Sequence, residues 1–206
     1  MGALARLFFA VGVSPEVASA LRSLVSKLRG GAGAEGLRFV DVDKAHFTLR
    51  FLGEQGPERQ AAALRAGKFA AAEMDAFDLA IGTLGVFPDE RRPHTVWAGA
   101  TNGASRLAEL ARRLEQRLVL EGFPDETRPF VPHLTVARVK RRPRADALRA
   151  LLARQPDTVA SQRVESFALM ESAPDGGGVR YIPLETFPLE IPCTPSKSPS
   201  TAGPKS

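Results

Sequence analysis

A four-residue pattern that occurs twice constrains the fold of this chain more than any other feature. His46-Phe47-Thr48-Leu49 recurs as His133-Leu134-Thr135-Val136, so two of the three histidines lie in matching His-x-Thr-x frames. Each tetrad lies within an alternating or apolar run, residues 45–52 and 131–139, and such runs are typical of strands. Because side chains alternate faces along a strand, each histidine shares a face with its threonine. If the two strands face each other across a groove, two imidazoles and two hydroxyls converge on one small volume, which suits a phosphate.

The composition is that of a globular protein with a basic surplus. Its 206 residues fit one large domain or two small lobes, and 44% hydrophobic residues can supply a core. The formal charge of +5 and the pI near 9.9 favour an anionic partner. Cys193 is the single cysteine, which excludes an intrachain disulfide and a cysteine cluster for a metal. We therefore expect a cytoplasmic protein.

The apolar run from Leu7 to Val13 resembles the core of a signal peptide but is interpreted as a strand. Ser14-Pro15-Glu16 follows it and has the features of a helix start, with Ser14 as N-cap and Pro15 at the first helical position. Cleavage near residue 20 would cut that helix. No apolar run is long enough to cross a bilayer, so no membrane association is expected.

The remaining periodicity predicts an α+β fold. Strands are expected at 6–13, 37–40, 45–52, 77–87, 95–100, 131–139, 164–171 and 179–189, and helices at 15–29, 57–74, 104–120 and 144–152. The turn signal at residues 174–178 predicts that the last two strands form a hairpin. We expect a single domain over residues 1–190 and a disordered tail over 191–206, where the composition shifts to Pro, Ser, Thr and Lys.

Several segments together resemble the 2H phosphoesterases, and in particular the bacterial and archaeal RNA 2',3'-cyclic phosphodiesterases, also called 2'-5' RNA ligases. The resemblance covers roughly residues 6–189 and rests on Arg6-Leu7-Phe8-Phe9-Ala10, His46-Phe47-Thr48-Leu49-Arg50-Phe51-Leu52-Gly53, Phe87-Pro88 and Arg128-Pro129-Phe130-Val131-Pro132-His133-Leu134-Thr135. It implies two pseudo-symmetric antiparallel sheets, flanked by helices, with the active site in a central cleft. It also implies an enzyme without metal or cofactor that acts on RNA with a 2',3'-cyclic phosphate end or on related small cyclic nucleotides. We expect a monomer.

The chemistry of the paired tetrads agrees with this resemblance. Opening a cyclic phosphate needs a base that activates water and an acid that protonates the departing ribose oxygen, and two imidazoles can do both near neutral pH. The hydroxyls of Thr48 and Thr135 can donate to the nonbridging oxygens. The resemblance implies that His46 is the proton donor and His133 the proton acceptor, because the enzymes concerned leave a 2'-phosphate.

The arginine that meets the phosphate is harder to assign. The resemblance favours Arg138, although strict alternation places it on the face opposite His133, so that a bulge in the strand is required. Alternation favours Arg50, which shares the face of His46 and Thr48. Lys140 and the arginines after it are expected either to hold an RNA backbone or to form a solvated basic loop.

Other interpretations of the same residues are less favoured. His94 has no matching frame and is expected at the surface, and metal binding by His46 and His133 lacks a third ligand. One of Phe8 and Phe9 is expected in the core, while the other is free to stack on a base. The rival functions are a 2H enzyme acting on 2'-5' oligonucleotides or an ADP-ribose cyclic phosphate, and a noncatalytic module that binds RNA ends.

Overall fold

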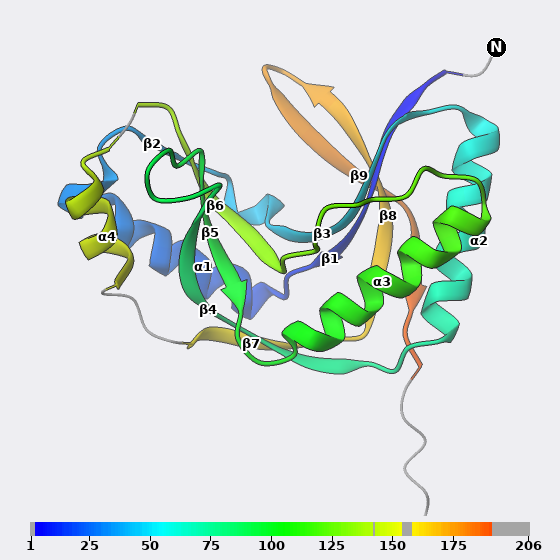
Figure 1. Cartoon of the computed structure of the whole chain (residues 1–206). Coiled ribbons are helices and arrows are strands. Elements are labelled where there is room, and N and C mark those ends of the chain that lie inside the picture. The colour runs from blue at the N-terminus through cyan, green and yellow to red at the C-terminus, as the bar shows by residue number, and fades with distance from the viewer. Residues whose placement is uncertain (1–2, 142, 154–157, 191–206) are drawn as a thin grey trace, which may run out of the picture.

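The computed structural model describes residues 3–141, 143–153 and 158–190 (Figure 1). Its strands are β1 (Ala5–Gly12), β2 (Leu37–Phe39), β3 (His46–Gln55), β4 (Phe77–Phe87), β5 (Thr95–Ala100), β6 (His133–Val139), β7 (Thr158–Val164), β8 (Ser166–Asp175) and β9 (Gly178–Pro188). Its helices are α1 (Pro15–Arg29), α2 (Pro57–Ala72), α3 (Ala104–Leu120) and α4 (Ala145–Ala153), with short 3-10 turns at Ala32–Ala34 and Val42–Lys44. The predicted tail, residues 191–206, lies outside the described residues.

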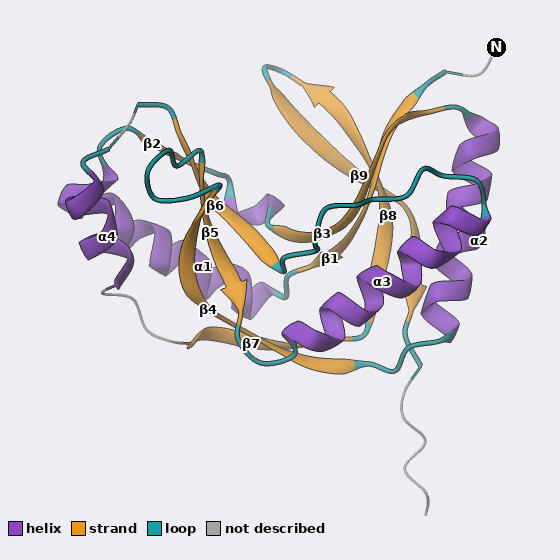
Figure 2. Ribbon diagram, in the orientation of Figure 1, coloured by secondary structure: helices purple, strands orange, loops and turns teal. Residues whose placement is uncertain are grey.

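The strands form two antiparallel sheets, as the resemblance to the 2H phosphoesterases implied (Figure 2). The first sheet has the order β3-β1-β8-β9 and the second the order β2-β6-β5-β4-β7. The tetrad strands β3 and β6 therefore belong to different sheets, and they contact each other where the two sheets meet. The predicted hairpin of β8 and β9 is confirmed.

Each sheet is covered by a pair of helices, one pair on each side of the molecule (Figure 1). Helices α2 and α3 pack on each other and against the first sheet, whereas α1 and α4 pack against β7 and β4 of the second. Ser14 caps α1, because its hydroxyl accepts a hydrogen bond from the backbone N–H of Val17, and the predicted apolar stripe of this helix is buried.

The chain passes repeatedly between the lobes. Strand β1 lies in the first sheet, and the helix that follows it covers the second. One continuous hydrophobic core consequently contains residues of both sheets, among them Phe9, Leu79 and Leu134. This shared core fixes the position of β3 relative to β6, and with it the position of the two tetrads.

One strand was not predicted. β7 lies at the edge of the second sheet, and its sequence, TVASQRV, is mostly polar or small. Only Val164 of this strand is buried, so β7 shows little of the apolar alternation on which the prediction depends. No helix among the described residues is long and apolar enough to cross a membrane.

Candidate active site

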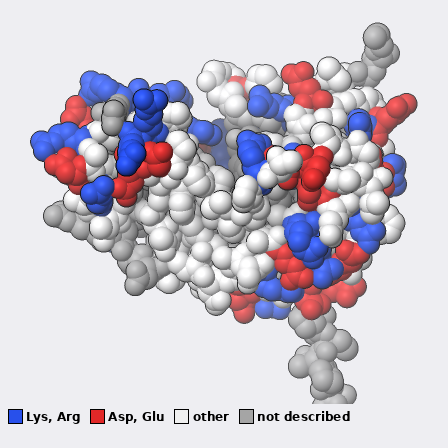
Figure 3. All heavy atoms as spheres, in the orientation of Figure 1, with Lys and Arg blue, Asp and Glu red and all other residues white. Residues whose placement is uncertain are grey.

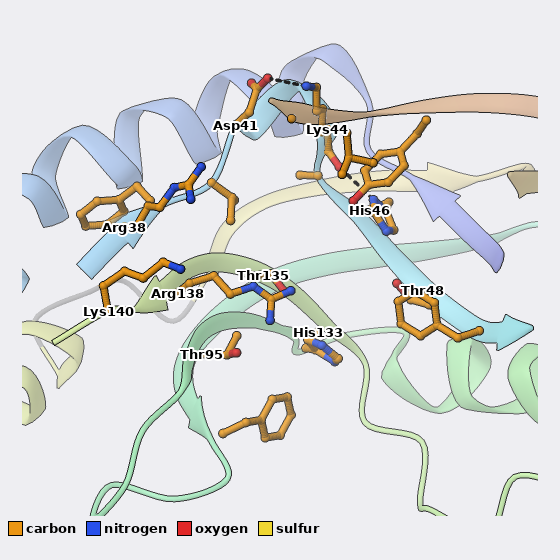
Figure 4. Close-up of a pocket in the computed structure, with 18 of the residues that line it drawn as sticks. Arg38, Asp41, Lys44, His46, Thr48, Thr95, His133, Thr135, Arg138 and Lys140 are labelled. Atoms are coloured by element: carbon orange, nitrogen blue, oxygen red, sulfur yellow. Dashed lines mark hydrogen bonds and ion pairs between the residues drawn. The ribbon is translucent and has the colours of Figure 1, made fainter. Parts of the chain in front are cut away.

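Both tetrads open onto one pocket of about 690 Å³ between the two sheets. His46 and Thr48 line it from β3, and His133 and Thr135 line it from β6 (Figure 4). The alternate, apolar residues of each tetrad point into the core, where Phe47 and Leu134 are fully buried. The structure thus brings together the four side chains that the sequence predicted to converge.

The two histidines are held in the same way. Nδ1 of His46 lies 2.8 Å from the carbonyl oxygen of Lys44, and Nδ1 of His133 lies 2.8 Å from that of Val131, in each case the carbonyl two residues earlier. Because a carbonyl only accepts, Nδ1 carries the hydrogen in both rings. Each Nε2 is then left to exchange a proton with a bound molecule.

Aromatic rings fix the planes of the two imidazoles. Tyr181 meets the His46 ring edge to face, with centroids 5.0 Å apart, and Phe87 meets His133 in the same geometry at 4.9 Å. The Phe8 ring also packs against the His46 ring, with centroids 5.1 Å apart. Such contacts restrict rotation of the rings, so that each Nε2 keeps its direction.

The expectation that Phe8 or Phe9 is free to stack on a base does not fit the structure. Phe8 is 2% exposed and Phe9 is fully buried, since both pack against neighbouring rings. Phe51 instead lines the pocket and is 59% exposed, and Tyr181 lines it too.

Burial lowers the pKa of His46 below its ordinary value. The carbonyl of Lys44 opposes this effect by stabilising the charged ring, and the nearby His133 adds to it through like-charge repulsion. The neutral form of His46 is therefore favoured in the free site. A bound phosphate, being anionic, acts in the opposite direction and favours the protonated form.

A bulge in β6 places Arg138 in the pocket. Along the ladder with β5, Thr135 pairs with Trp97 and Ala137 with Val96, which leaves Val136 without a partner. The alternation shifts by one residue at that point, so Val136 and Ala137 are both buried and Arg138 returns to the face of Thr135. The bulge that Arg138 required is present.

A second bulge, in β3, turns Arg50 away from the pocket. Thr48 pairs with Ala10 and Arg50 with Phe9, so Leu49 is the unpaired residue, and the next side chain on the pocket face is Phe51. The Arg50 side chain is only 13% exposed. The predicted phosphate contact of Arg50 therefore does not fit its position, because the bulge reverses the face on which it lies.

Arg50 has structural partners instead. Its Nε donates to Glu115 at 2.7 Å, its guanidinium also donates to the carbonyl of Pro124, and Glu126 lies 3.6 Å away. These contacts tie β3 to α3 and to the segment that leads into β6, so Arg50 supports the scaffold of the site.

Some pocket residues were not identified from the sequence as site residues. Among them are Arg38 on β2, Thr95 on β5, Phe51 and Tyr181. Thr95 is buried and lies opposite Arg138 in the ladder of β5 and β6. Their faces depend on how strands pair, which a single strand pattern does not specify. His94 is exposed, as predicted.

The pocket is lined by more cations than anions. Arg38, Lys44, Arg138 and Lys140 line it together with Asp41. Figure 3 shows a hollow between the two lobes with basic side chains beside it, whereas acidic and basic groups mix over α2 and α3. Among the described residues, no three His, Cys, Asp or Glu side chains are grouped so that they could hold a metal ion.

Comparison with known proteins identifies the family of this site. The model of the 2'-5' RNA ligase superfamily matches residues 11–176. The chain belongs to the 2'-5' RNA ligase superfamily. Its resemblance to this superfamily, inferred from the paired tetrads, is confirmed.

Relatives in the superfamily match over most of the chain. An RNA 2',3'-cyclic phosphodiesterase of Methanothermobacter thermautotrophicus is 33% identical, over 89% of this chain and 98% of its own length. The crystal structure of TT0787 from Thermus thermophilus superimposes with a TM-score of 0.76 at 31% identity, covering 91% of this chain and 99% of that one. The crystal structure of Escherichia coli LigT complexed with 3'-AMP superimposes with a TM-score of 0.72 at 30% identity, covering 90% of this chain and 98% of that one. The bilobal fold that the resemblance implied is therefore confirmed.

Proposed function

We propose that this protein hydrolyses RNA 2',3'-cyclic phosphate ends to 2'-phosphomonoester ends, using one His-x-Thr pair from each lobe and no metal. The observation that carries the proposal is the matched setting of His46 and His133, each with Nδ1 on a carbonyl and Nε2 left for the pocket. Two imidazoles on opposing strands are what an in-line displacement at phosphorus needs, one on the side of attack and one on the side of departure.

In the proposed reaction, His46 is the acid and His133 the base, as the resemblance to enzymes that leave a 2'-phosphate implies. His133, neutral, takes a proton from water through Nε2 as the water oxygen bonds to phosphorus. The bond between phosphorus and the 3' oxygen breaks, and His46, protonated by the effect of the bound anion on its pKa, gives its Nε2 proton to that oxygen. One water is consumed, and the products are a 3' hydroxyl and a 2'-phosphate. His133 is then protonated and His46 neutral, so the cycle closes by proton exchange with solvent.

The remaining polar groups of the pocket meet the negative charge. Thr48 and Thr135 donate their hydroxyl hydrogens to the nonbridging oxygens, where charge builds in the transition state. Arg138 neutralises the phosphate charge from the same face as Thr135. This division lets acid–base catalysis proceed without a metal ion.

The lining of the pocket favours a nucleotide as substrate. Phe51 and Tyr181 supply aromatic surface for a base, and the cations supply sites for phosphate. The relatives named RNA 2',3'-cyclic phosphodiesterase and the LigT complex with 3'-AMP support the choice of a nucleotide as substrate. A 5'-hydroxyl can replace water as the nucleophile, which would join two RNA ends through a 2'-5' bond by the same steps.

The test is to incubate the purified protein with a short RNA that ends in a 2',3'-cyclic phosphate and to identify the product by phosphorus NMR. We expect a 2'-phosphomonoester, and we expect its formation to stop in the double variant His46→Ala/His133→Ala. Tight binding of the RNA without turnover would support the noncatalytic binding module instead. Turnover of only an ADP-ribose cyclic phosphate or a 2'-5' linked oligonucleotide would change the substrate class.

A further inference from the structure

Two arginines lie directly opposite each other beside the catalytic pocket. Arg38 on β2 pairs with Arg138 on β6 in the antiparallel ladder, and both line the pocket. Lys140 directly follows β6 and lines the pocket as well. Like charges at directly opposed positions of two strands destabilise a sheet. This arrangement therefore gains stability from an anion placed between the side chains.

The described part of the chain does not supply that anion. Among the described residues, no ion pair or side-chain hydrogen bond partner is found for Arg38, Arg138 or Lys140. The neighbouring cations are paired with carboxylates: Lys44 lies 3.6 Å from Asp41, and Arg141 lies 2.7 Å from Glu35. Asp41, the carboxylate in the pocket lining, is thus already paired.

The number of cations exceeds what the reacting phosphate requires. A cyclic phosphodiester carries a single negative charge, which Arg138 balances beside the two threonine hydroxyls. Figure 4 shows Arg38 and Lys140 extending from the side of the pocket away from His46 and Thr48, with Arg138 between them and His133. Within the described ranges, Arg38 and Lys140 consequently remain unpaired next to the reacting centre.

We propose that Arg38 and Lys140 form a second phosphate subsite, which holds the phosphodiester on the 5' side of the terminal nucleotide. This inference rests on the proposed function and names the residues that give an RNA chain an advantage over a cyclic mononucleotide. The terminal base lies toward Phe51 and Tyr181, and the chain leaves across the β2 and β6 edge of the second sheet. Arg38, on the short outer strand β2, recognises the chain without touching the reacting phosphorus.

The experiment compares three substrates that share one reacting end: adenosine 2',3'-cyclic phosphate, the same compound with a 5'-phosphate, and the dinucleotide ApA with a 2',3'-cyclic phosphate. We expect kcat/KM of the wild type to be about tenfold or more higher for the dinucleotide than for the unphosphorylated nucleoside, since a hydrogen bond to a charged group contributes at least that factor. A preference for the 5'-phosphorylated nucleoside but not for the dinucleotide would show that the subsite takes a terminal phosphomonoester.

Variants assign the preference to the subsite. In Arg38→Gln and Lys140→Gln, the ratio of kcat/KM between dinucleotide and nucleoside should fall toward one, and the slope of log kcat/KM against log salt for the dinucleotide should become shallower by roughly one. Arg112→Gln is the matched control, because Arg112 is exposed on α3 and its loss changes the net charge equally. The control should keep the wild-type ratio.

The outcomes separate this inference from the proposed function. Equal kcat/KM on all three substrates, or an unchanged ratio in both subsite variants, would overturn the subsite while leaving cyclic phosphate hydrolysis intact. Absence of turnover on every substrate would instead overturn the proposed function. Circular dichroism and Tm of Arg38→Gln show whether the variant is folded, and Arg38→Lys, which keeps the charge, should retain part of the preference.

Discussion

Phe51 and Arg138 occupy equivalent positions in the two halves of the pocket. Each follows its histidine by five residues, and each returns to the pocket face after an unpaired residue, Leu49 or Val136, has shifted the alternation of its strand. The backbone is thus pseudo-symmetric, while one half presents an aromatic ring and the other a guanidinium. A nucleotide, with a base at one end and phosphate at the other, has only one good orientation in such a site. In the proposed mechanism, that orientation assigns different roles to two chemically similar histidines.

The aromatic half leads to a prediction about substrate binding. Phe51→Ala should raise KM for a cyclic nucleotide about tenfold, because stacking of a base on an aromatic side chain is worth roughly 1–3 kcal/mol. Phe51→Trp should preserve KM, and Leu120→Ala, which removes an exposed apolar side chain on α3, is the matched control. Steady-state kinetics would test this, and an unchanged KM in Phe51→Ala would show that the base lies elsewhere.

The cationic half leads to a comparison of two arginines. Arg138→Gln should lower kcat/KM by roughly 10- to 100-fold with little change in Tm, since it removes a charged hydrogen bond to phosphate worth about 1.5–3 kcal/mol. Arg50→Gln should instead lower Tm, because it leaves Glu115 without its closest cation in a largely buried position. We expect this variant to destabilise the fold by about 1–3 kcal/mol.

Thermal unfolding and steady-state kinetics of the two variants distinguish these roles. If Arg50→Gln lost activity while keeping its Tm, Arg50 would be the phosphate ligand after all. Glu115→Gln is the control for the scaffold contact, and it should reproduce the loss of Tm seen in Arg50→Gln.

The sequence predicted the four tetrad side chains because their placement depends on alternation within one strand. The same rule failed for Arg50 because a bulge depends on the pairing of β3 with β1, which lies far away in the chain. Arg38 was missed for a related reason, since its importance comes from its register opposite Arg138. Local patterns identified the helices and most strands, including the full extent of α1. Bulges and cross-strand register, which depend on how two strands pair, became visible only in the structure.

The lowered pKa of His46 predicts a pH dependence of stability. The folded protein binds the His46 proton more weakly than the unfolded chain, whose histidine titrates near 6.5. The free energy of unfolding should therefore fall as the pH drops from about 6.5 through the folded pKa, and this contribution should then level off. His46→Gln lacks the titrating group, so its Tm should decline less between pH 8 and pH 5. Identical pH dependence in both proteins would show that His46 is not perturbed.

Acid–base catalysis by imidazoles predicts activity in the presence of chelator. Turnover of the dinucleotide ApA with a 2',3'-cyclic phosphate should be unchanged in excess EDTA, because the proton transfers and the phosphate charge are assigned to protein groups. The measurement is kcat before and after dialysis against EDTA, with added Mg²⁺ or Mn²⁺ as a further arm. Loss of turnover that is restored by one of these ions would rule out the metal-free mechanism.

Substitution of each histidine tests the assignment of acid and base. His46→Ala and His133→Ala should each lower kcat by roughly 100-fold or more, the usual contribution of general acid or base catalysis. If His46 protonates the departing oxygen, a substrate whose leaving group needs no proton should restore much of the activity of His46→Ala but little of that of His133→Ala.

The wild type should show a bell-shaped pH profile of kcat/KM, and each variant should lose one limb of it. Rescue of His133→Ala in place of His46→Ala would exchange the two roles, an arrangement that the neutral form of His46 in the free site would then explain. Near-normal turnover in both variants would rule out catalysis by the two histidines.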